Sequence, residues 1–229
     1  MRAVPILLAL AALAACSPRS PGEPKTAVAA PQAKTVPAAK APREAPAGVY
    51  TLDPDHTSVV FRVSHMGLSH YTARFTRIDG QLTFDPANPA AQQVTATIDA
   101  GSLATAYPDP AKLDFDAQVE KQFLDAARYP QITFRSTKVE PTGAETARVT
   151  GDLTLHGVTR PIVLAVTYNG GYKAGGMDPK GHRVGFSAHG AFKRSDFGIT
   201  YGVPAPGTTF GVGDDVEVIV ETEFTRLPG

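Results

Sequence analysis

Residues 149–168 alternate between apolar and polar side chains, and this two-residue period constrains the fold more than any other feature of the chain. In the first half, polar Asp152 and Thr154 are interleaved with apolar residues, and Gly157 and Pro161 mark a break before the alternation resumes. The apolar positions of the two halves are Val149, Leu153, Leu155, Ile162, Leu164, Val166 and Tyr168. A two-residue period on both sides of a glycine- and proline-containing break predicts a β-hairpin with one buried face.

The same period recurs over most of residues 49–229 and predicts further strands. They are expected around residues 59–63, 78–84, 94–98, 132–136, 184–188 and 216–222. Because no segment provides the long crossovers that parallel strands need, neighbouring strands are expected to be antiparallel. Closure of such a sheet would remove its exposed edges. The sequence therefore predicts an all-β fold, an antiparallel barrel of about eight strands.

One helical insertion is expected within residues 101–131, where the two-residue period is lost. Asp114 or Asp116 can cap its first turn, and Tyr129-Pro130 is expected to end it. Apolar residues recur there at three- and four-residue spacing, namely Phe115, Val119, Phe123, Ala126 and Ala127. A helix with a single apolar stripe must lie against something, so we expect it across the barrel mouth or along its wall.

The N-terminal segment has the layout of a cleavable export signal. Arg2 is followed by an apolar run that ends at Ala15 and is too short to span a bilayer. Leu13-Ala14-Ala15-Cys16 resembles a bacterial lipobox, which implies lipidation of Cys16 after removal of residues 1–15. An ordinary export signal with a cysteine at this place is the alternative.

Residues 16–48 are predicted to tether the lipidated cysteine to a folded domain at 49–229. The tether consists mostly of Ala, Pro, Lys and Gln with almost no large apolar side chain. Such a composition buries too little surface to offset the entropy of ordering, so the tether is expected to be disordered. Attached acyl chains would anchor the protein to a membrane.

Charge and motif content argue against several functions. The 22 basic and 22 acidic residues lack the basic excess of nucleic-acid-binding proteins, so no nucleic-acid partner is expected. HExxH, CxxC and GxSxG patterns do not occur in the sequence. The histidines show no spacing typical of metal ligands, and Arg194-Ser195-Asp196 is interpreted as a turn ion pair. We therefore predict no catalytic residue, no metal and no cofactor.

Several separated motifs between residues 49 and 226 resemble the YceI-like family and occur in the family's order. They are Asp53-Pro-Asp-His-Thr-Ser-Val-Val-Phe-Arg-Val-Ser-His65, Phe84-Asp-Pro-Ala-Asn-Pro89, Phe123-Leu-Asp-Ala-Ala-Arg-Tyr-Pro130, Thr133-Phe-Arg-Ser136, Gly151-Asp-Leu-Thr-Leu-His-Gly-Val-Thr159 and Asp196-Phe-Gly-Ile199. The resemblance implies a lipocalin-like barrel that binds a polyisoprenoid or similar long-chain amphiphile, such as a quinone or its precursor, without catalysis. It also implies a place in the bacterial envelope, and with the lipobox we expect a periplasm-facing lipoprotein anchored in the outer membrane.

The resemblance turns the inward-facing residues into candidates for the lining of a ligand pocket. They are Phe61, Val63, Leu82, Phe84, Ile98, Phe134, Leu153, Leu155, Ile162, Leu164, Val166 and Phe186. An eight-stranded barrel is of the size at which side chains either fill the interior or leave room for one small ligand. Alternation alone does not distinguish the two cases.

Two other functions stay open at this point. One is an enzyme acting on an isoprenoid lipid, with His56, His65 or Asp196 taking part. The other is a structural envelope module whose barrel is filled by its own side chains. The sequence also leaves the oligomeric state open between a monomer and a homodimer.

Overall fold

The computed structural model describes residues 41–176, 178–179 and 181–228. The predicted signal peptide, Cys16 and most of the predicted tether lie outside these residues, so lipidation at Cys16 stays a prediction.

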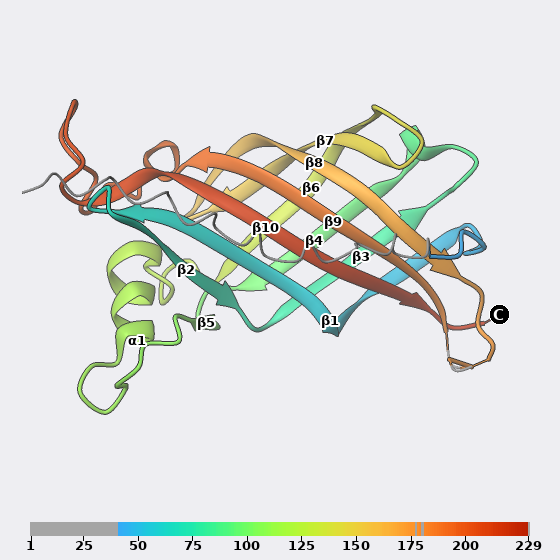
Figure 1. Ribbon diagram of the computed structural model, residues 1–229, viewed down its shortest axis with the longest axis horizontal. Helices are drawn as coiled ribbons and strands as arrows, with labels where there is room; N and C mark the ends of the chain where they lie inside the picture. Colours follow the sequence, from blue (N-terminus) through green and yellow to red (C-terminus); the bar gives the residue numbers. More distant parts are fainter. Residues whose placement is uncertain (1–40, 177, 180, 229) are drawn as a thin grey trace, which may run out of the picture. The chain divides into compact units, whose positions relative to one another are not determined.

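Ten strands among the described residues form one antiparallel sheet that closes into a barrel (Figure 1). They are β1 (Gly48–His65), β2 (Ser69–Phe75), β3 (Ile78–Phe84), β4 (Gln93–Asp99), β5 (Leu103–Ala104), β6 (Gln131–Pro141), β7 (Thr146–Leu155), β8 (Val158–Tyr172), β9 (His182–Lys193) and β10 (Val212–Arg226). Eight of them form the ring in the order β10-β9-β8-β7-β6-β4-β3-β1, which closes where β1 pairs with β10. The predicted all-β barrel is thus confirmed.

The long strand β1 makes closure possible because it pairs with different partners along its length. Residues 48–51 pair with β3 and residues 59–65 with β2, while β10 lies along the other side. The sequence pattern did not identify β2 as a strand of its own. The turn between them gives little signal, because one of its left-handed positions is Met66, with a φ of 54°, rather than a residue typical of turns.

The predicted hairpin at residues 149–168 is formed by β7 and β8. Its turn has two residues, His156 and Gly157, with φ values of 52° and 76°, as a type I′ turn requires. Pro161 lies inside β8 rather than in the break where the sequence placed it. The apolar face of β7 is buried inside the barrel, as at Leu153.

The predicted helix is present but shorter than expected. It consists of α1 (Phe115–Val119) and the π-turn η2 (Glu120–Leu124), and it ends at Asp125, which has a φ of 45°. The expectation that Tyr129-Pro130 ends it was wrong, because a left-handed residue ends the helix earlier. The predicted cap is confirmed at Asp114, whose carboxylate accepts a hydrogen bond from the Ala117 N–H at 3.0 Å.

The described residues also contain two single-turn 3-10 helices, η1 (Pro89–Ala91) and η3 (Arg194–Phe197). Across the described residues, no helix has the length and apolar character needed to cross a membrane.

Residues 41–47, which we call the strap, lie against β8, although the sequence predicted disorder up to residue 48. The Glu44 N–H donates to the Gly171 carbonyl at 2.8 Å, and the Gly171 N–H donates to the Pro42 carbonyl at 2.7 Å. Ala45 is buried in the core. These contacts stabilise the strap, because backbone hydrogen bonds and apolar burial offset the entropy of ordering it.

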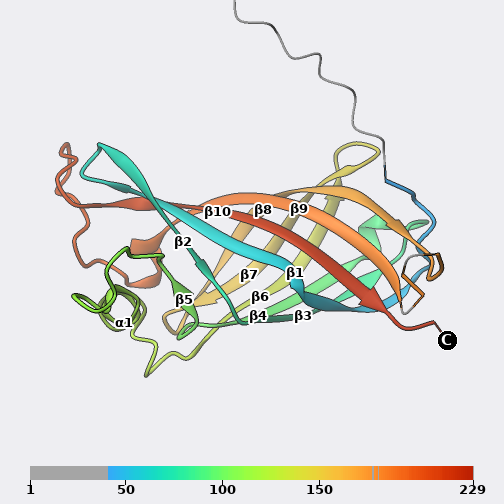
Figure 2. The ribbon, with the colours of Figure 1, turned by 60° about the horizontal axis from the view of Figure 1, so that its bottom comes forward.

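Most of the buried apolar side chains in the described residues belong to one of two clusters, one toward each end of the barrel. The helix packs against the first cluster through Val119 and Phe123. The strap contributes Ala45 to the second cluster, which also contains Tyr50 and Phe84. Figure 2 shows α1 at one end of the barrel and the first described residues at the other.

Candidate functional site

The barrel encloses a cavity of about 790 Å³. All twelve residues predicted to line a pocket lie on its wall, namely Phe61, Val63, Leu82, Phe84, Ile98, Phe134, Leu153, Leu155, Ile162, Leu164, Val166 and Phe186. They reach it from seven of the eight ring strands, because inward positions recur every second residue along each strand. Their role in binding a ligand stays a prediction.

The size of the cavity argues against a structural module with a filled barrel. Pockets that hold small molecules have volumes of about 300 to 1,000 Å³, and this cavity falls within that range. The inward residues of this chain leave the interior open because several wall positions carry only small side chains, as at Ala73, Ala96, Ala147 and Ala188.

The helix supplies apolar side chains at one end of the cavity. Phe115, Val119, Phe123 and Leu124 all line it. The ring of Phe115 packs edge-on against Tyr71 of β2, with ring centroids 5.6 Å apart. The helix therefore lies across one end of the barrel, as its apolar stripe predicted.

Sequence reasoning missed several lining residues on β2 and in the strap. Tyr71, Ala73 and Phe75 line the cavity from β2, and Arg43 lines it from the strap. The alternation of Tyr71, Ala73 and Phe75 is a two-residue period that points to a strand. For Arg43 the local sequence gives no signal, because its position depends on contacts with residues more than a hundred positions away.

Arg194 also lines the cavity, and it is not in the turn ion pair with Asp196 that the sequence suggested. Its guanidinium donates hydrogen bonds to the backbone carbonyls of Gly213, Ile199, Tyr201 and Val212, at distances from 2.6 to 2.9 Å. The side chain is buried, and burial lowers the pKa of Arg194 because it removes water from the charged form. The prediction was wrong because the loop that follows η3 and the start of β10 surround the guanidinium with their carbonyls.

The residues considered for catalysis do not come together. His65 lines the cavity, whereas His56 is hydrogen-bonded to Asp53 in an exposed position in the middle of β1. Asp196 lies in η3, where its backbone carbonyl accepts a hydrogen bond from Arg160. Of these three candidates only His65 faces the cavity.

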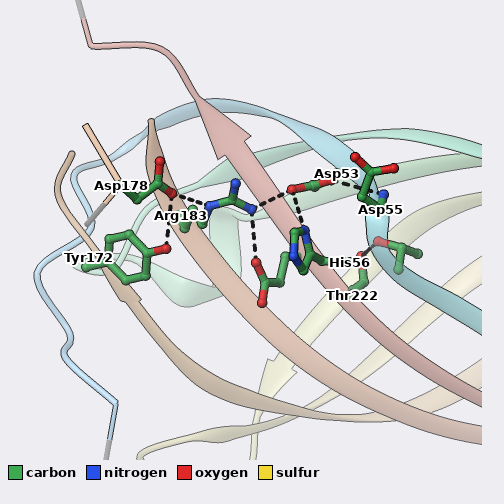
Figure 3. Close-up of polar contacts among 9 residues, drawn as sticks. Asp53, Asp55, His56, Tyr172, Asp178, Arg183 and Thr222 are labelled. Carbon is green, nitrogen blue, oxygen red and sulfur yellow. Dashed lines mark hydrogen bonds and ion pairs between the residues drawn. The ribbon is translucent and has the colours of Figure 1, made fainter. Parts of the chain in front are cut away.

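A polar cluster on the outer face links β1, β9, β10 and the loop before β9 (Figure 3). Arg183 of β9 is at its centre and forms ion pairs with Asp53, Asp178 and Glu223. Asp53 also accepts a hydrogen bond from His56 at 2.9 Å. Because the partners come from separate strands, the cluster holds together the region where the ring closes.

Asp53, His56 and Glu223 have ligand atoms within 4.8 Å of one another, close enough for one metal ion. However, the guanidinium of Arg183 donates hydrogen bonds to both carboxylates. A positive charge therefore already lies where a cation would bind, and the donor set fits an ion-pair network better than a metal site.

The same contacts shift the pKa of two members of the cluster. Burial opposes ionisation of Asp53, but hydrogen bonds from Arg183 and His56 outweigh it and lower the pKa of this carboxyl. The hydrogen bond to Asp53 raises the pKa of His56 above its usual 6.5. The folded protein therefore favours the charged form of both side chains.

We expect His56→Ala to destabilise the barrel in a way that depends on pH. The pKa of His56 is raised in the folded state, so its contribution is complete below pH 6.5 and is lost as the pH rises through the folded pKa. The difference in free energy of unfolding between wild type and variant should be largest near pH 5.5 and close to zero by about pH 9. Urea denaturation across this range measures it.

His189→Ala is the matched control, because His189 is exposed on the outer face of β9. A difference for His56→Ala that stays constant from about pH 5.5 to about pH 9 would contradict the assigned ion pair.

Comparison with known proteins places these features in a family. A family model described as the YceI-like domain matches residues 50–224. A UPF0312 protein of Pseudomonas savastanoi pv. phaseolicola is 41% identical over 169 residues, which cover 72% of this chain and 82% of the relative. A UPF0312 protein of Vibrio cholerae is 38% identical over 161 residues, which cover 69% of this chain and 81% of the relative.

Solved structures show the same barrel. BcnA from Burkholderia cenocepacia superposes with a TM-score of 0.62 at 26% identity, covering 75% of this chain and 98% of its own. A YceI protein from Campylobacter jejuni gives a TM-score of 0.59 at 28% identity, covering 72% of this chain and 90% of its own. A polyisoprenoid binding domain from Saccharophagus degradans gives 0.54 at 15% identity, covering 78% and 98%, and at that identity the likeness shows the fold alone. The match over residues 50–224 and the identity to the Pseudomonas relative show that the chain belongs to the YceI-like domain family.

Proposed function

We propose that the barrel binds a polyisoprenoid or a similar long-chain amphiphile in its cavity and carries or stores it without catalysis. The observation that supports this most is the cavity of about 790 Å³, whose wall consists mainly of apolar side chains. A domain of the same fold from Saccharophagus degradans is named a polyisoprenoid binding domain, and this agrees with the proposal.

An apolar chain needs no catalytic group or metal to be retained in such a cavity. Burial of apolar surface contributes about 25 cal/mol per Å², so roughly 400 Å² of buried ligand surface would contribute about 10 kcal/mol. Ordering the ligand and losing its free motion cost several kcal/mol of this. The remaining free energy, about 6 kcal/mol, corresponds to affinities on the order of tens of micromolar.

The proposed location is the bacterial envelope, with the barrel facing the periplasm. The support is the sequence Leu13-Ala14-Ala15-Cys16 and the predicted tether after it. Acyl chains on Cys16 would hold the barrel close to the outer membrane, where a long-chain amphiphile can be exchanged.

The second candidate is an enzyme that acts on such a lipid, and one observation favours it. His65 lines the cavity, so an imidazole could reach a bound ligand. Turnover of a prenyl substrate that disappears with His65→Ala, in a variant that still binds the substrate, would support this candidate over simple carriage.

We expect the full-length protein purified from a bacterial envelope to contain a long-chain lipid. Organic extraction followed by mass spectrometry should recover a prenyl compound at close to one per barrel. Protein that is repeatedly recovered empty, and that does not bind prenyl compounds added later, would contradict the proposal.

A further inference from the structure

The strap brings a guanidinium to the end of the cavity opposite the helix. Arg43 lines the cavity and lies over the ring of Tyr168, with its Cζ 5.5 Å from the ring centroid. Its Nη2 forms an ion pair with Glu145 Oε1 at 2.6 Å. Glu145 belongs to the connection between β6 and β7, so the pair bridges two separate segments at the cavity mouth.

The end of β8 is shaped to hold the strap in this position. A Cβ on Gly170 would lie 2.5 Å from Cβ of Ala41, and one on Gly171 would lie 2.9 Å from Cβ of Ala45. Larger residues at these two positions would push the strap away. The strap is also held by β1, because the Tyr50 hydroxyl donates a hydrogen bond to the Pro46 carbonyl at 2.7 Å. The position of Arg43 therefore follows from backbone and side-chain contacts on several sides.

Arg43 and Arg194 both line the cavity, but they differ in burial and in hydrogen-bond partners. Arg194 is buried and already donates to four backbone carbonyls. The side chains of Arg43 and Glu145 instead retain 34% and 31% of their exposure. An ion pair this exposed is worth no more than about 1 kcal/mol, so its carboxylate can be exchanged for another anion.

The two arginines mark opposite ends of the cavity. Gly171, which holds the strap, pairs with Val184 near the start of β9, and Arg194 follows the end of β9. Ten residues of an extended strand separate Val184 from Arg194, which corresponds to roughly 33 Å. A chain-like ligand lying along the barrel would thus have one end near Arg43 and the other near the apolar helix.

We propose that Arg43 binds an anionic head group of the phosphate type, carried by the amphiphile whose chain occupies the cavity, and that this head group replaces Glu145. The inference rests on the proposed function and adds the orientation of the ligand. Arginine and phosphate form strong paired hydrogen bonds, and Gln92 and Gln93 line the cavity with amide groups from the start of β4, at the same end. At the mouth the charged head stays close to water, which keeps the cost of removing its hydration low.

The test compares two probes with the same hydrocarbon chain, geranylgeranyl diphosphate and geranylgeraniol, bound to the full chain. We expect the wild type to bind the diphosphate at least about tenfold more tightly. Arg43→Gln should abolish this preference while changing the affinity for the alcohol less than about twofold. Arg43→Lys should keep part of the preference, because it keeps the charge.

Two further variants sharpen the assignment. Glu145→Gln removes the competing carboxylate and should raise the affinity for the diphosphate with no gain for the alcohol. Arg148→Gln removes the same charge as Arg43→Gln from an exposed position on β7, and it should leave both affinities unchanged.

The contrary results distinguish the head-group site from the proposed function. Equal wild-type affinity for the two probes, or an equal loss of both with Arg43→Gln, would overturn the head-group site and leave the cavity proposal standing. Inorganic diphosphate that binds as tightly as the prenyl diphosphate would mean a site for free phosphate and would also overturn it. Failure of the wild type to bind either probe would instead overturn the proposed function.

Discussion

Replacement of Arg194 by methionine is expected to lower the free energy of unfolding by about 4 kcal/mol or more. Methionine matches much of the length of arginine but cannot donate hydrogen bonds. Four backbone carbonyls, those of Gly213, Ile199, Tyr201 and Val212, would lose their donor. Each buried acceptor left unsatisfied costs about 1 to 3 kcal/mol. Small domains have only about 5 to 15 kcal/mol of stability, so much of the variant should unfold under mild denaturation.

Urea denaturation followed by circular dichroism measures this effect, and Arg160→Met provides the control. Arg160 is exposed, and its Nε donates to a single carbonyl, that of Asp196, at 3.4 Å. Its replacement should change the free energy of unfolding by no more than about 0.5 kcal/mol. A loss below about 1 kcal/mol for Arg194→Met would mean that water replaces the guanidinium at these carbonyls.

Replacement of Ala188 by phenylalanine is expected to weaken binding of geranylgeraniol about 100-fold. Ala188 lies on the cavity wall in register with Val166 and Val220, which line the cavity from the strands on either side. A phenylalanine ring there would occupy space that the ligand chain needs. Loss of roughly 110 Å² of ligand contact, at about 25 cal/mol per Å², corresponds to about 2.7 kcal/mol. Retention of radiolabelled geranylgeraniol by the purified protein measures the affinity.

Ala191→Phe is the matched control for this substitution. Ala191 lies on the same strand but on its exposed, outward face, so the added ring should leave binding unchanged. The stability of the Ala188 variant should fall little, because the ring enters space that the barrel leaves empty. Full binding by folded Ala188→Phe protein would contradict the assignment of the cavity as the ligand site.

The alternation of residues along the chain was enough to predict which side chains face the interior. Leu153 and Ile162 illustrate this, since both were assigned to one face of a hairpin and both line the cavity. The strand period is a local property, so it can be recognised without knowing which strands pair. The ends of the helix were harder to predict. It ends at Asp125 because that residue adopts a left-handed conformation. Aspartate can adopt this conformation but usually does not, so the residue type provides no clear signal there.

The polar contacts could not be predicted because their partners are distant in the sequence. Arg183 and Asp53 are 130 residues apart and meet only after β1, β9 and β10 pair in their final register. Arg194 was taken for half of a local ion pair, yet its partners are carbonyls of the loop and strand that follow it. The ordered strap was missed for the same reason, since glycine positions at the end of β8 allow it to approach.

By itself, the sequence determined that the domain is an antiparallel barrel and which residues face its interior. Strand periodicity and the order of the family motifs can both be recognised in the sequence without knowing which strands pair. Only the tertiary structure decided that the interior holds an open cavity of about 790 Å³ and that Arg43 and Arg194 lie on its wall. The physical reason is that the space left inside a barrel depends on the number, tilt and stagger of its strands together with the volumes of all inward side chains. The alternation of residues along one strand gives no information about the volume that remains inside the barrel.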